Sequence, residues 1–383
     1  MKLITEQLTW DHQTFESYIE GMCDQVRAFP SERITFWAST TPEVILAFFA
    51  IWKVGKIACP LNTRLPKAPL TTELFTPFMP RPQAPTPTDW DLNRAAAHLF
   101  TSGSTGNPKI AQLTLGNLVY SAEGSNQIFP LKQDDVWGLT LPLFHVGGIG
   151  ILLRSYLAKS AVTLNTNLAT RLSLVPTQLY RLLKEPLPLL KTVLLGGAPL
   201  PDLNTPWHVV PTYGMTEMSS QIVTDHKIHP HAELKIENDQ EIWVKGKVLF
   251  QGYLGHSPVE GWFPTGDLGS WKRGKFQILG RKDNMFISGG ENIQPEEVEE
   301  VIRRVRGLGE VIVVPLKCAE FGQRPGVFLN DTSLFSTLQE QLKDHLPKYK
   351  IPIKAFQLPT QNGLKPNRKA LASIAASDYH FSQ

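Results

Sequence analysis

The stretch at residues 33–62, "RITFWASTTPEVILAFFAIWKVGKIACPLN", decides the fold class because it places a helical run between two short β-type runs. Thr41 can cap that helix, Pro42 suits the first helical position, and Glu43 adds an acid to the first turn. The order strand, helix, strand is typical of a βαβ unit. We therefore expect an α/β core.

The pattern changes three times along the chain. Residues 61–95 are rich in proline and threonine and predict a connection over the surface. Strands and helices alternate again from Ala96, and after Glu233 strands follow one another with tight turns. A second domain is expected near Arg281, ahead of a helix whose apolar residues share one face. The predicted domains are residues 1–280 and 281–383.

Charge and cysteine content narrow the function classes. The 38 Lys and Arg residues against 35 Asp and Glu residues give a net charge of +3, too small and dispersed to indicate nucleic acid. The three cysteines show no C-x-x-C spacing, which favours a reducing compartment. Because no uncharged apolar run reaches about 18 residues, no membrane span is expected. We expect a cytoplasmic protein with small-molecule partners, and a homo-oligomer stays open.

Residues 99–114, "LFTSGSTGNPKIAQLT", crowd hydroxyls, glycines and Lys109 between two apolar segments. Free backbone N–H groups, hydroxyls and a lysine suit a polyphosphate. The spacing is not that of a Walker A loop, since Gly103 and Gly106 are too close together. A generic Gly/Ser turn remains the alternative for this segment taken alone.

Four further blocks follow in order. They are "TYGMTEMSS" (212–220), "GWFPTGDLG" (261–269), "GRKDNMFISGGENIQPEEVE" (280–299) and "NGLKPNR" (362–368). Together with the loop before Lys109, they resemble the acyl-adenylate-forming superfamily, which includes acyl- and aryl-CoA synthetases, luciferase-type enzymes and peptide-synthetase adenylation domains. The resemblance implies a large N-terminal domain of layered sheets and helices, and a small α+β C-terminal domain joined by a hinge.

The resemblance also implies a two-step reaction that uses ATP, Mg²⁺ and CoA. A carboxylate attacks the α-phosphate of ATP, pyrophosphate leaves, and the resulting acyl-AMP is attacked by the CoA thiol to give a thioester. The protein contributes mainly alignment and charge stabilisation to such transfers.

Most of the site residues that the resemblance implies surround the nucleotide; for each one, a turn or a surface charge is the ordinary alternative. They are Thr101, Ser102, Gly103, Ser104, Thr105, Gly106 and Lys109 at the β- and γ-phosphates, Gly196, Gly197, Ala198, Pro199 and Tyr213 beside adenine, Asp267 at the ribose with Arg281 nearby, Thr216 at the α-phosphate, and Glu217 at Mg²⁺.

The second domain carries the remaining mechanistic residues. The superfamily has a lysine that bridges the carboxylate and the α-phosphate; Lys365 is preferred for this role and Lys369 stays open, because Leu364 interrupts the usual Gly-Lys pair. Asp283 falls at the hinge position, with an ordinary linker aspartate as the alternative. Rotation about the hinge would bring Ser288, Gly289 and Gly290 toward the CoA channel.

Two residues bear on the acid. His145 takes the position of the superfamily's gate beside the acyl pocket, with a structural histidine as the alternative. Arg181 follows a strand on a helix with apolar neighbours, where a cation would pair with a second carboxylate of an aromatic substrate; a solvated arginine is the alternative. Another aryl- or acyl-CoA ligase, a standalone adenylation enzyme acting on a carrier protein, and a non-catalytic adenylate binder stay open.

One departure from the superfamily concerns length. The connection between "PLNTRLP" (60–66) and the phosphate loop is shorter than usual. This predicts that part of one sheet layer is absent.

Overall fold

A computed structural model describes nine stretches of the chain, with short gaps between them. They are residues 1–65, 68, 73–87, 89–101, 109–183, 185–196, 205–306, 310–359 and 367–379. Several predicted site residues lie outside them, namely Ser102, Gly103, Ser104, Thr105, Gly106, Gly197, Ala198, Pro199 and Lys365.

The predicted βαβ unit is present as β3 (Arg33–Trp37), α2 (Pro42–Val54) and β4 (Ile57–Leu61). The Thr41 hydroxyl accepts a hydrogen bond from the backbone N–H of Val44 at 3.4 Å, as a helix cap should. The two strands run parallel. They end a five-stranded sheet of order β16-β6-β5-β4-β3, whose other members are β5 (Ala95–Thr101), β6 (Lys109–Thr114) and β16 (Gly252–Tyr253).

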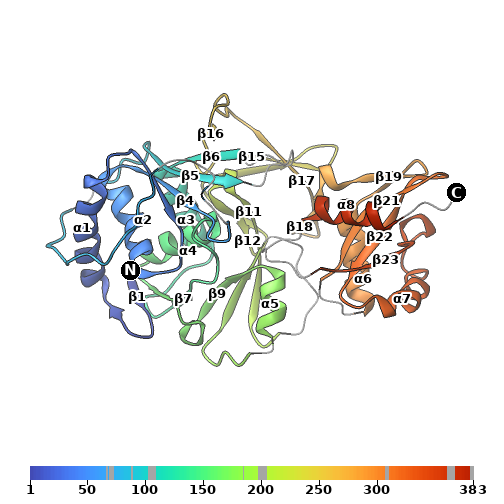
Figure 1. Ribbon diagram of the computed structural model, residues 1–383, viewed down its shortest axis with the longest axis horizontal. Coiled ribbons are helices and arrows are strands. Elements are labelled where there is room, and N and C mark those ends of the chain that lie inside the picture. Colours follow the sequence, from blue (N-terminus) through green and yellow to red (C-terminus); the bar gives the residue numbers. More distant parts are fainter. Residues whose placement is uncertain are drawn as a thin grey trace.

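A second sheet has nine strands in the order β13-β12-β11-β10-β9-β7-β8-β1-β2. Helix α3 contacts β5 and β6 of the first sheet and β12 of the second, and α4 packs on α3 and on β8 and β12 of the second sheet (Figure 1). The elements of this part are β1 (Lys2–Ile4), β2 (Thr9–Trp10), α1 (His12–Ala28), α3 (Leu115–Ile128), β7 (Val136–Gly138), α4 (Val146–Leu157), β8 (Ala161–Thr163), η1 (Thr166–Leu168), β9 (Arg171–Leu174), α5 (Pro176–Leu182), β10 (Thr192–Leu195), β11 (His208–Met215), η2 (Thr216–Met218), β12 (Ser220–Thr224) and β13 (Lys227–Ile228).

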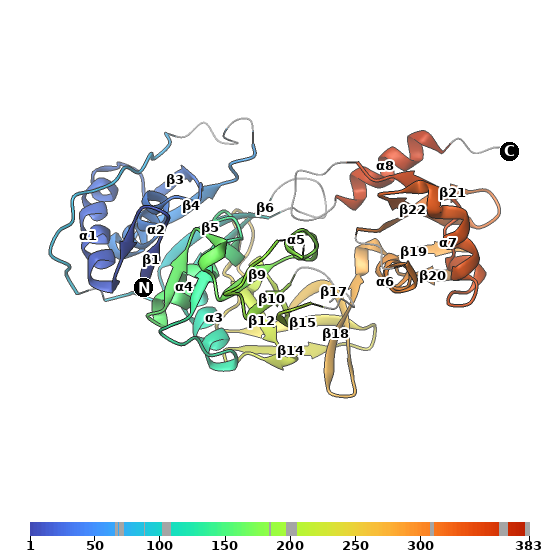
Figure 2. The ribbon, with the colours of Figure 1, turned by 90° about the horizontal axis from the view of Figure 1, so that it is seen from below.

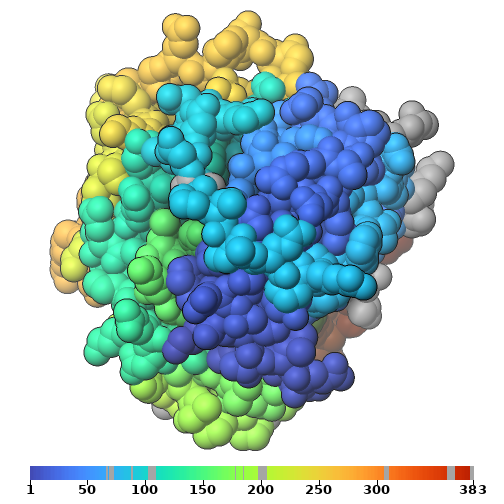
Figure 3. All heavy atoms as spheres, turned by 90° about the vertical axis from the view of Figure 1, so that its left-hand side faces the viewer, coloured from blue at the N-terminus to red at the C-terminus, as the bar shows by residue number. Residues whose placement is uncertain are grey.

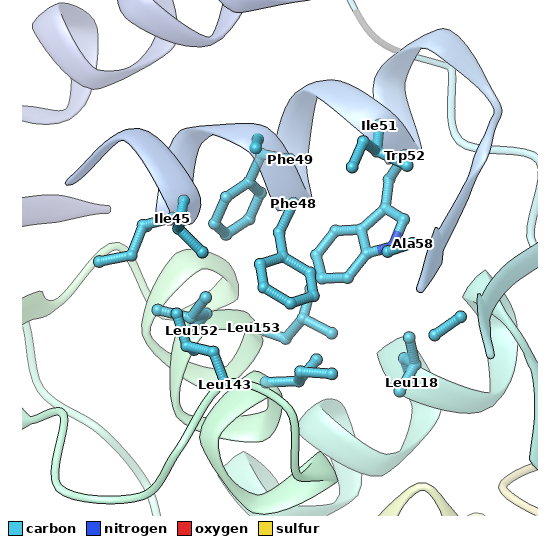
Figure 4. Packing of buried hydrophobic residues seen from close by; sticks show 14 of the residues in the cluster. Ile45, Phe48, Phe49, Ile51, Trp52, Ala58, Leu118, Leu143, Leu152 and Leu153 are labelled. Atoms are coloured by element: carbon cyan, nitrogen blue, oxygen red, sulfur yellow. The ribbon is translucent and has the colours of Figure 1, made fainter. Parts of the chain in front are cut away.

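The main hydrophobic core lies where α2 meets the central helices. Figure 4 shows Phe48 and Trp52 of α2 pointing toward Leu152 and Leu153 of α4, and all four side chains are buried. The rings of Phe48 and Phe36 meet edge to face at 5.2 Å. The apolar run of α2 is thus buried all round, as expected for a helix between other layers.

A segment without helix or strand connects β4 to β5. Its described residues 73–87, called here the crossover segment, lie against α1, and Figure 3 shows this part of the chain on the surface beside the N-terminal residues. Gln25 of α1 donates to and accepts from the backbone of Phe78, and Glu20 accepts from the backbone of Thr86. The predicted surface connection is therefore confirmed for the described residues.

The strand-rich region follows β13. It is a four-stranded antiparallel sheet of order β14-β15-β17-β18, formed by β14 (Ala232–Ile236), β15 (Glu241–Gly246), β17 (Phe263–Lys272) and β18 (Lys275–Arg281). The change of pattern after Glu233 is confirmed.

The last part of the chain lies apart from the rest in both ribbon views (Figures 1 and 2). Its two hydrophobic clusters draw all their buried residues from Phe286 onward. It contains η3 (Lys282–Asn284), β19 (Phe286–Ser288), β20 (Glu291–Ile293), α6 (Pro295–Arg306), β21 (Ile312–Cys318), β22 (Gly322–Leu329), η4 (Thr332–Leu334), α7 (Phe335–Leu342), η5 (Lys348–Lys350), β23 (Ala355–Gln357) and α8 (Arg368–Asp378).

A helix that the sequence analysis did not predict lies at the C-terminal end. Helix α8 begins at Arg368, and the side chain of Asn367 caps it by accepting from the backbone N–H of Ala370 at 3.1 Å. The helix buries little, mainly Leu371 and Ala375, which explains its weak apolar pattern. Among the described helices, none is long and apolar enough to cross a membrane.

Candidate active site

Three predicted residues meet at one carboxylate. The Tyr213 hydroxyl donates to Asp267 Oδ2 at 2.8 Å, and Arg281 Nη1 donates to Asp267 Oδ1 at 3.0 Å. The register of β17 and β18 sets this contact, because Asp267 and Arg281 are directly opposite each other. The expected proximity of Asp267 and Arg281 is therefore present.

Arg281 also joins this group to the start of the last domain. Its Nε donates to Asp283 Oδ1 at 3.1 Å, so the arginine lies between two carboxylates. Burial alone would lower the pKa of Arg281, but Asp267 and Asp283 outweigh it and raise that pKa. Burial and the nearby Asp267 charge hold the pKa of Tyr213 well above its usual value, so its hydroxyl remains a donor.

Glu217 is held by a tight connection between β11 and β12. A side chain at Gly214 would place its Cβ 1.8 Å from the carbonyl oxygen of Ser220, so only glycine allows the two strands to approach this closely. Glu217 is 8% exposed, its Oε1 accepts from the Tyr253 hydroxyl at 2.6 Å, and its backbone carbonyl accepts from the N–H of Phe250 at 2.8 Å. Thr216 precedes it and is partly buried.

Thr101 and Lys109 flank the phosphate loop, whose residues 102–108 lie outside the described part of the chain. They are paired across β5 and β6, and the Thr101 hydroxyl donates to the Lys109 carbonyl at 3.3 Å. The Lys109 ammonium lies 4.9 Å from the centre of the Tyr253 ring. The arrangement therefore brings Lys109 and Glu217 to the same tyrosine.

Sequence reasoning missed Tyr253. It lies 36 residues from Glu217, and no local pattern distinguishes it from a structural tyrosine. Pairing of β16 with β6, with Tyr253 opposite Ala111, produces the contact.

The donor set near Glu217 fits Mg²⁺. A carboxylate beside a threonine hydroxyl offers the hard oxygen ligands that this ion prefers. Among the described residues, no group of three or more His, Cys, Asp or Glu side chains could hold a metal by itself. Phosphate oxygens would therefore have to complete the coordination.

Gly196 lies just after β10, beside β11. Its backbone N–H donates to the Leu174 carbonyl at 3.1 Å, and an added Cβ would come within 2.7 Å of Thr212 Oγ1. The predicted adenine neighbours Gly196 and Tyr213 therefore belong to adjacent parallel strands or their ends.

His145 and Arg181 are both exposed. His145 is the residue before α4, and its ring lies 4.5 Å from that of Phe144. Phe144 lines an open pocket together with residues 38–40, 63–64 and 139–142. Arg181 occupies the last turn of α5. Burial raises the pKa of Glu310, and the charge of Arg181 opposes part of that rise.

The predicted C-terminal residues occupy a hairpin and a helix end. Gly289 (φ 58°) and Gly290 (φ 87°) form the two-residue turn between β19 and β20, in the left-handed region that favours glycine. Ser288 before them is buried. Lys369 is exposed in the first turn of α8, and Lys365 lies outside the described residues.

The sequence profile of the AMP-binding enzymes matches residues 67–254. The chain belongs to this family, since a curated relative is 35% identical over an alignment that covers 97% of this chain and 94% of the relative. The resemblance to acyl-adenylate-forming enzymes is confirmed. The relative is the 2-succinylbenzoate–CoA ligase of Escherichia coli (strain K12).

Solved structures agree with this placement. A variant of E. coli MenE with bound OSB-AMS superimposes with a TM-score of 0.86 at 29% identity, covering 98% of this chain and 96% of that one. The o-succinylbenzoate CoA synthetase (MenE) of Bacillus subtilis in complex with ATP and magnesium ion gives 0.81 at 27% identity, with 96% of each chain covered. The predicted fold of layered sheets and helices is confirmed.

Proposed function

We propose that this protein is an ATP-dependent, AMP-forming 2-succinylbenzoate–CoA ligase that acts in the cytoplasm in menaquinone or phylloquinone biosynthesis. The observation that carries the chemistry is that Tyr213 and Glu217 lie at the two ends of one short segment. Tyr213 is hydrogen-bonded to Asp267, and Glu217 is hydrogen-bonded to Tyr253. The relatives named for this activity support the substrate. The three cysteines are free thiols, which fits a reducing compartment.

In the first half-reaction the acid's carboxylate oxygen bonds to the α-phosphorus of ATP, and the bond to pyrophosphate breaks. Asp267 would accept the ribose hydroxyls, with Arg281 holding its other side. Thr216 would contact the α-phosphate. Lys109 and the loop that begins at Thr101 would contact the β- and γ-phosphates. Mg²⁺ at Glu217 supplies positive charge that offsets the charge of the phosphates.

In the second half-reaction the CoA sulfur bonds to the acyl carbon and AMP leaves. We place the domain boundary between residues 280 and 281, with Asp283 as the hinge; the separation of the hydrophobic clusters before and after this point supports the division. Rotation would withdraw Lys365, or Lys369, and present the turn at Ser288, Gly289 and Gly290 to CoA.

The acid is the most specific part of the proposal. The chain resembles o-succinylbenzoate–CoA ligases in the segments around His145 and Arg181 and in its small size. The substrate carries one carboxylate to be activated and a second on its succinyl arm. Arg181, whose side chain is exposed, would pair with the second carboxylate, and His145 would lie beside the acyl pocket as its gate.

A panel assay tests the proposal. The protein is incubated with ATP, Mg²⁺, CoA and separate acids that include o-succinylbenzoate, benzoates and fatty acids, and thioesters are measured by mass spectrometry. A dominant o-succinylbenzoyl-CoA product is expected. A different dominant thioester would keep the ligase chemistry and reject the acid. Pyrophosphate release without any thioester would favour a carrier-protein acceptor, and no ATP turnover would favour a binder.

A further inference from the structure

Tyr253 lies between the two charged groups of the proposed phosphate site. Its hydroxyl donates to Glu217 Oε1 at 2.6 Å, and its ring faces the Lys109 ammonium at 4.9 Å from the ring centre. Within the described part of the chain, no ion pair joins Lys109 to Glu217 directly. The tyrosine therefore contacts a cation with its face and an anion with its hydroxyl.

Strand pairing and a ring contact fix the position of Tyr253. Strand β16 pairs with β6 two residues beyond Lys109, and the backbone N–H of Leu254 donates to the Ile110 carbonyl at 2.8 Å. The Phe250 ring meets the Tyr253 ring edge to face at 4.9 Å. Because Phe250 also donates its N–H to the Glu217 carbonyl, residues 250–253 hold Glu217 by both its backbone and its carboxylate.

This arrangement has a chemical consequence for both partners. The tyrosine occupies Oε1 of Glu217, so Oε2 is the oxygen that this bond leaves for a metal. A direct ion pair between Lys109 and Glu217 would neutralise the cation that the phosphates need and the anion that Mg²⁺ needs. A ring face attracts an ammonium without neutralising it.

We infer that Tyr253 is a positioning residue of the nucleotide site, which orients the Glu217 carboxylate for the metal of metal–ATP and keeps Lys109 apart from it. The inference rests on the proposed function, since it assigns Glu217 and Lys109 to metal and phosphate. It adds a residue outside the motifs that define the site.

The test separates the hydroxyl from the ring. Tyr253→Phe keeps the ring, and Tyr253→Leu removes both contacts. Mn²⁺ replaces Mg²⁺ as the probe, and its binding with ATP is followed by electron paramagnetic resonance, while ATP binding in EDTA is followed by calorimetry. Loss of a hydrogen bond to a charged group should weaken Mn²⁺–ATP binding by Tyr253→Phe roughly tenfold and leave metal-free ATP binding within about twofold. Tyr253→Leu should weaken both.

A matched control variant and a double-mutant cycle test whether the effect of Tyr253→Phe acts through Glu217. Tyr120 of α3 also lies under a lysine, with Lys247 Nζ 4.8 Å from its ring centre, but it lies outside the proposed site. Tyr120→Phe should bind Mn²⁺–ATP like the unmodified protein. In a Glu217→Gln background, Tyr253→Phe should have no further effect on Mn²⁺–ATP binding, because the hydroxyl acts through that carboxylate.

Three outcomes would overturn the inference. Unchanged Mn²⁺–ATP binding by Tyr253→Phe is one, and equal weakening of metal-free ATP is another, since it indicates general damage. An undiminished effect in the Glu217→Gln background is the third. If the unmodified protein bound no Mn²⁺–ATP, the proposed function would fail as well. If it bound Mn²⁺–ATP but made no o-succinylbenzoyl-CoA, the proposed function would fail while the inference about Tyr253 would still be tested by the binding measurements.

Discussion

Glu20 and Lys53 form a buried ion pair that attaches the crossover segment to α1 and α2. Lys53 Nζ lies 2.7 Å from Glu20 Oε2, and each side chain is 7% exposed. Thr86 of the crossover segment donates its N–H and its hydroxyl to the same oxygen, at 3.0 and 2.9 Å. We predict that Glu20→Gln destabilises the N-terminal part of the protein, because it leaves the Lys53 charge buried without its anion.

The pKa of Glu20 sets the expected magnitude. Burial alone would raise this pKa, but the hydrogen bonds from Lys53 and Thr86 outweigh it and lower the pKa from 4.5 to about 2. One pKa unit is about 1.4 kcal/mol, so the carboxylate contributes about 3 kcal/mol, within the usual cost of breaking a buried pair. Because the folded pKa is the lower one, this contribution is complete above pH 4.5 and is lost as the pH falls toward 2.

Urea unfolding followed by tryptophan fluorescence measures the effect. All nine tryptophans precede residue 281, so the signal reports the N-terminal part alone. With a slope of about 3 kcal/mol per M, the Glu20→Gln midpoint should fall by about 1 M at pH 7, and the difference from the unmodified protein should shrink below pH 4.5. Glu20→Met with Lys53→Met should recover most of the loss, since no charge is left unpaired.

The control is Glu233→Gln, which breaks an exposed pair with Lys245 at 3.4 Å. It should cost less than about 0.5 kcal/mol. Equal effects of Glu20→Gln and Glu233→Gln, or a Glu20→Gln deficit that persists unchanged at pH 3, would refute the assignment of stability to the buried pair.

Three further predictions concern the reaction. Lys365→Ala should abolish adenylation yet leave thioester formation from supplied acyl-AMP largely intact, measured as separate half-reactions, with Lys369→Ala as control; equal loss of both half-reactions would reject the lysine assignment. Arg181→Ala should raise the KM for o-succinylbenzoate about tenfold or more and that for benzoate little. Asp267→Asn should raise the KM for ATP by about tenfold without changing the KM for CoA, because it weakens contacts to the ribose hydroxyls and releases Arg281.

Local patterns predicted the elements that carry strong caps and apolar runs. Thr41, Pro42 and the apolar residues of α2 allowed the βαβ unit to be predicted, and the apolar face of α6 allowed that helix to be predicted. Helix α8 was missed because it buries few apolar residues, so its stability depends on tertiary contacts that no window of sequence displays.

The candidate site contains residues that the sequence motifs predicted and one residue that they did not. Motif segments supplied Tyr213, Glu217, Asp267 and Arg281, and the structure brings them into two neighbouring groups. Tyr253 lies outside these motif segments. Its contact with Glu217 arises from the pairing of strands that are far apart in the sequence. Such a residue becomes visible only once the sheet register is known.

The start of α8 has a mechanical consequence for adenylation. Arg368 bonds the Glu296 and Glu299 carboxylates of α6 and the Val313 carbonyl of β21, and it lies three residues after Lys365. Asn367 caps the helix, so the start of α8 is fixed both by this cap and by the contacts of Arg368 with α6 and β21. Because an extended chain spans at most about 3.6 Å per residue, Lys365 lies within about 7 Å of Asn367. In the proposed rotation about the hinge, Lys365 would therefore stay within this distance of the fixed start of α8.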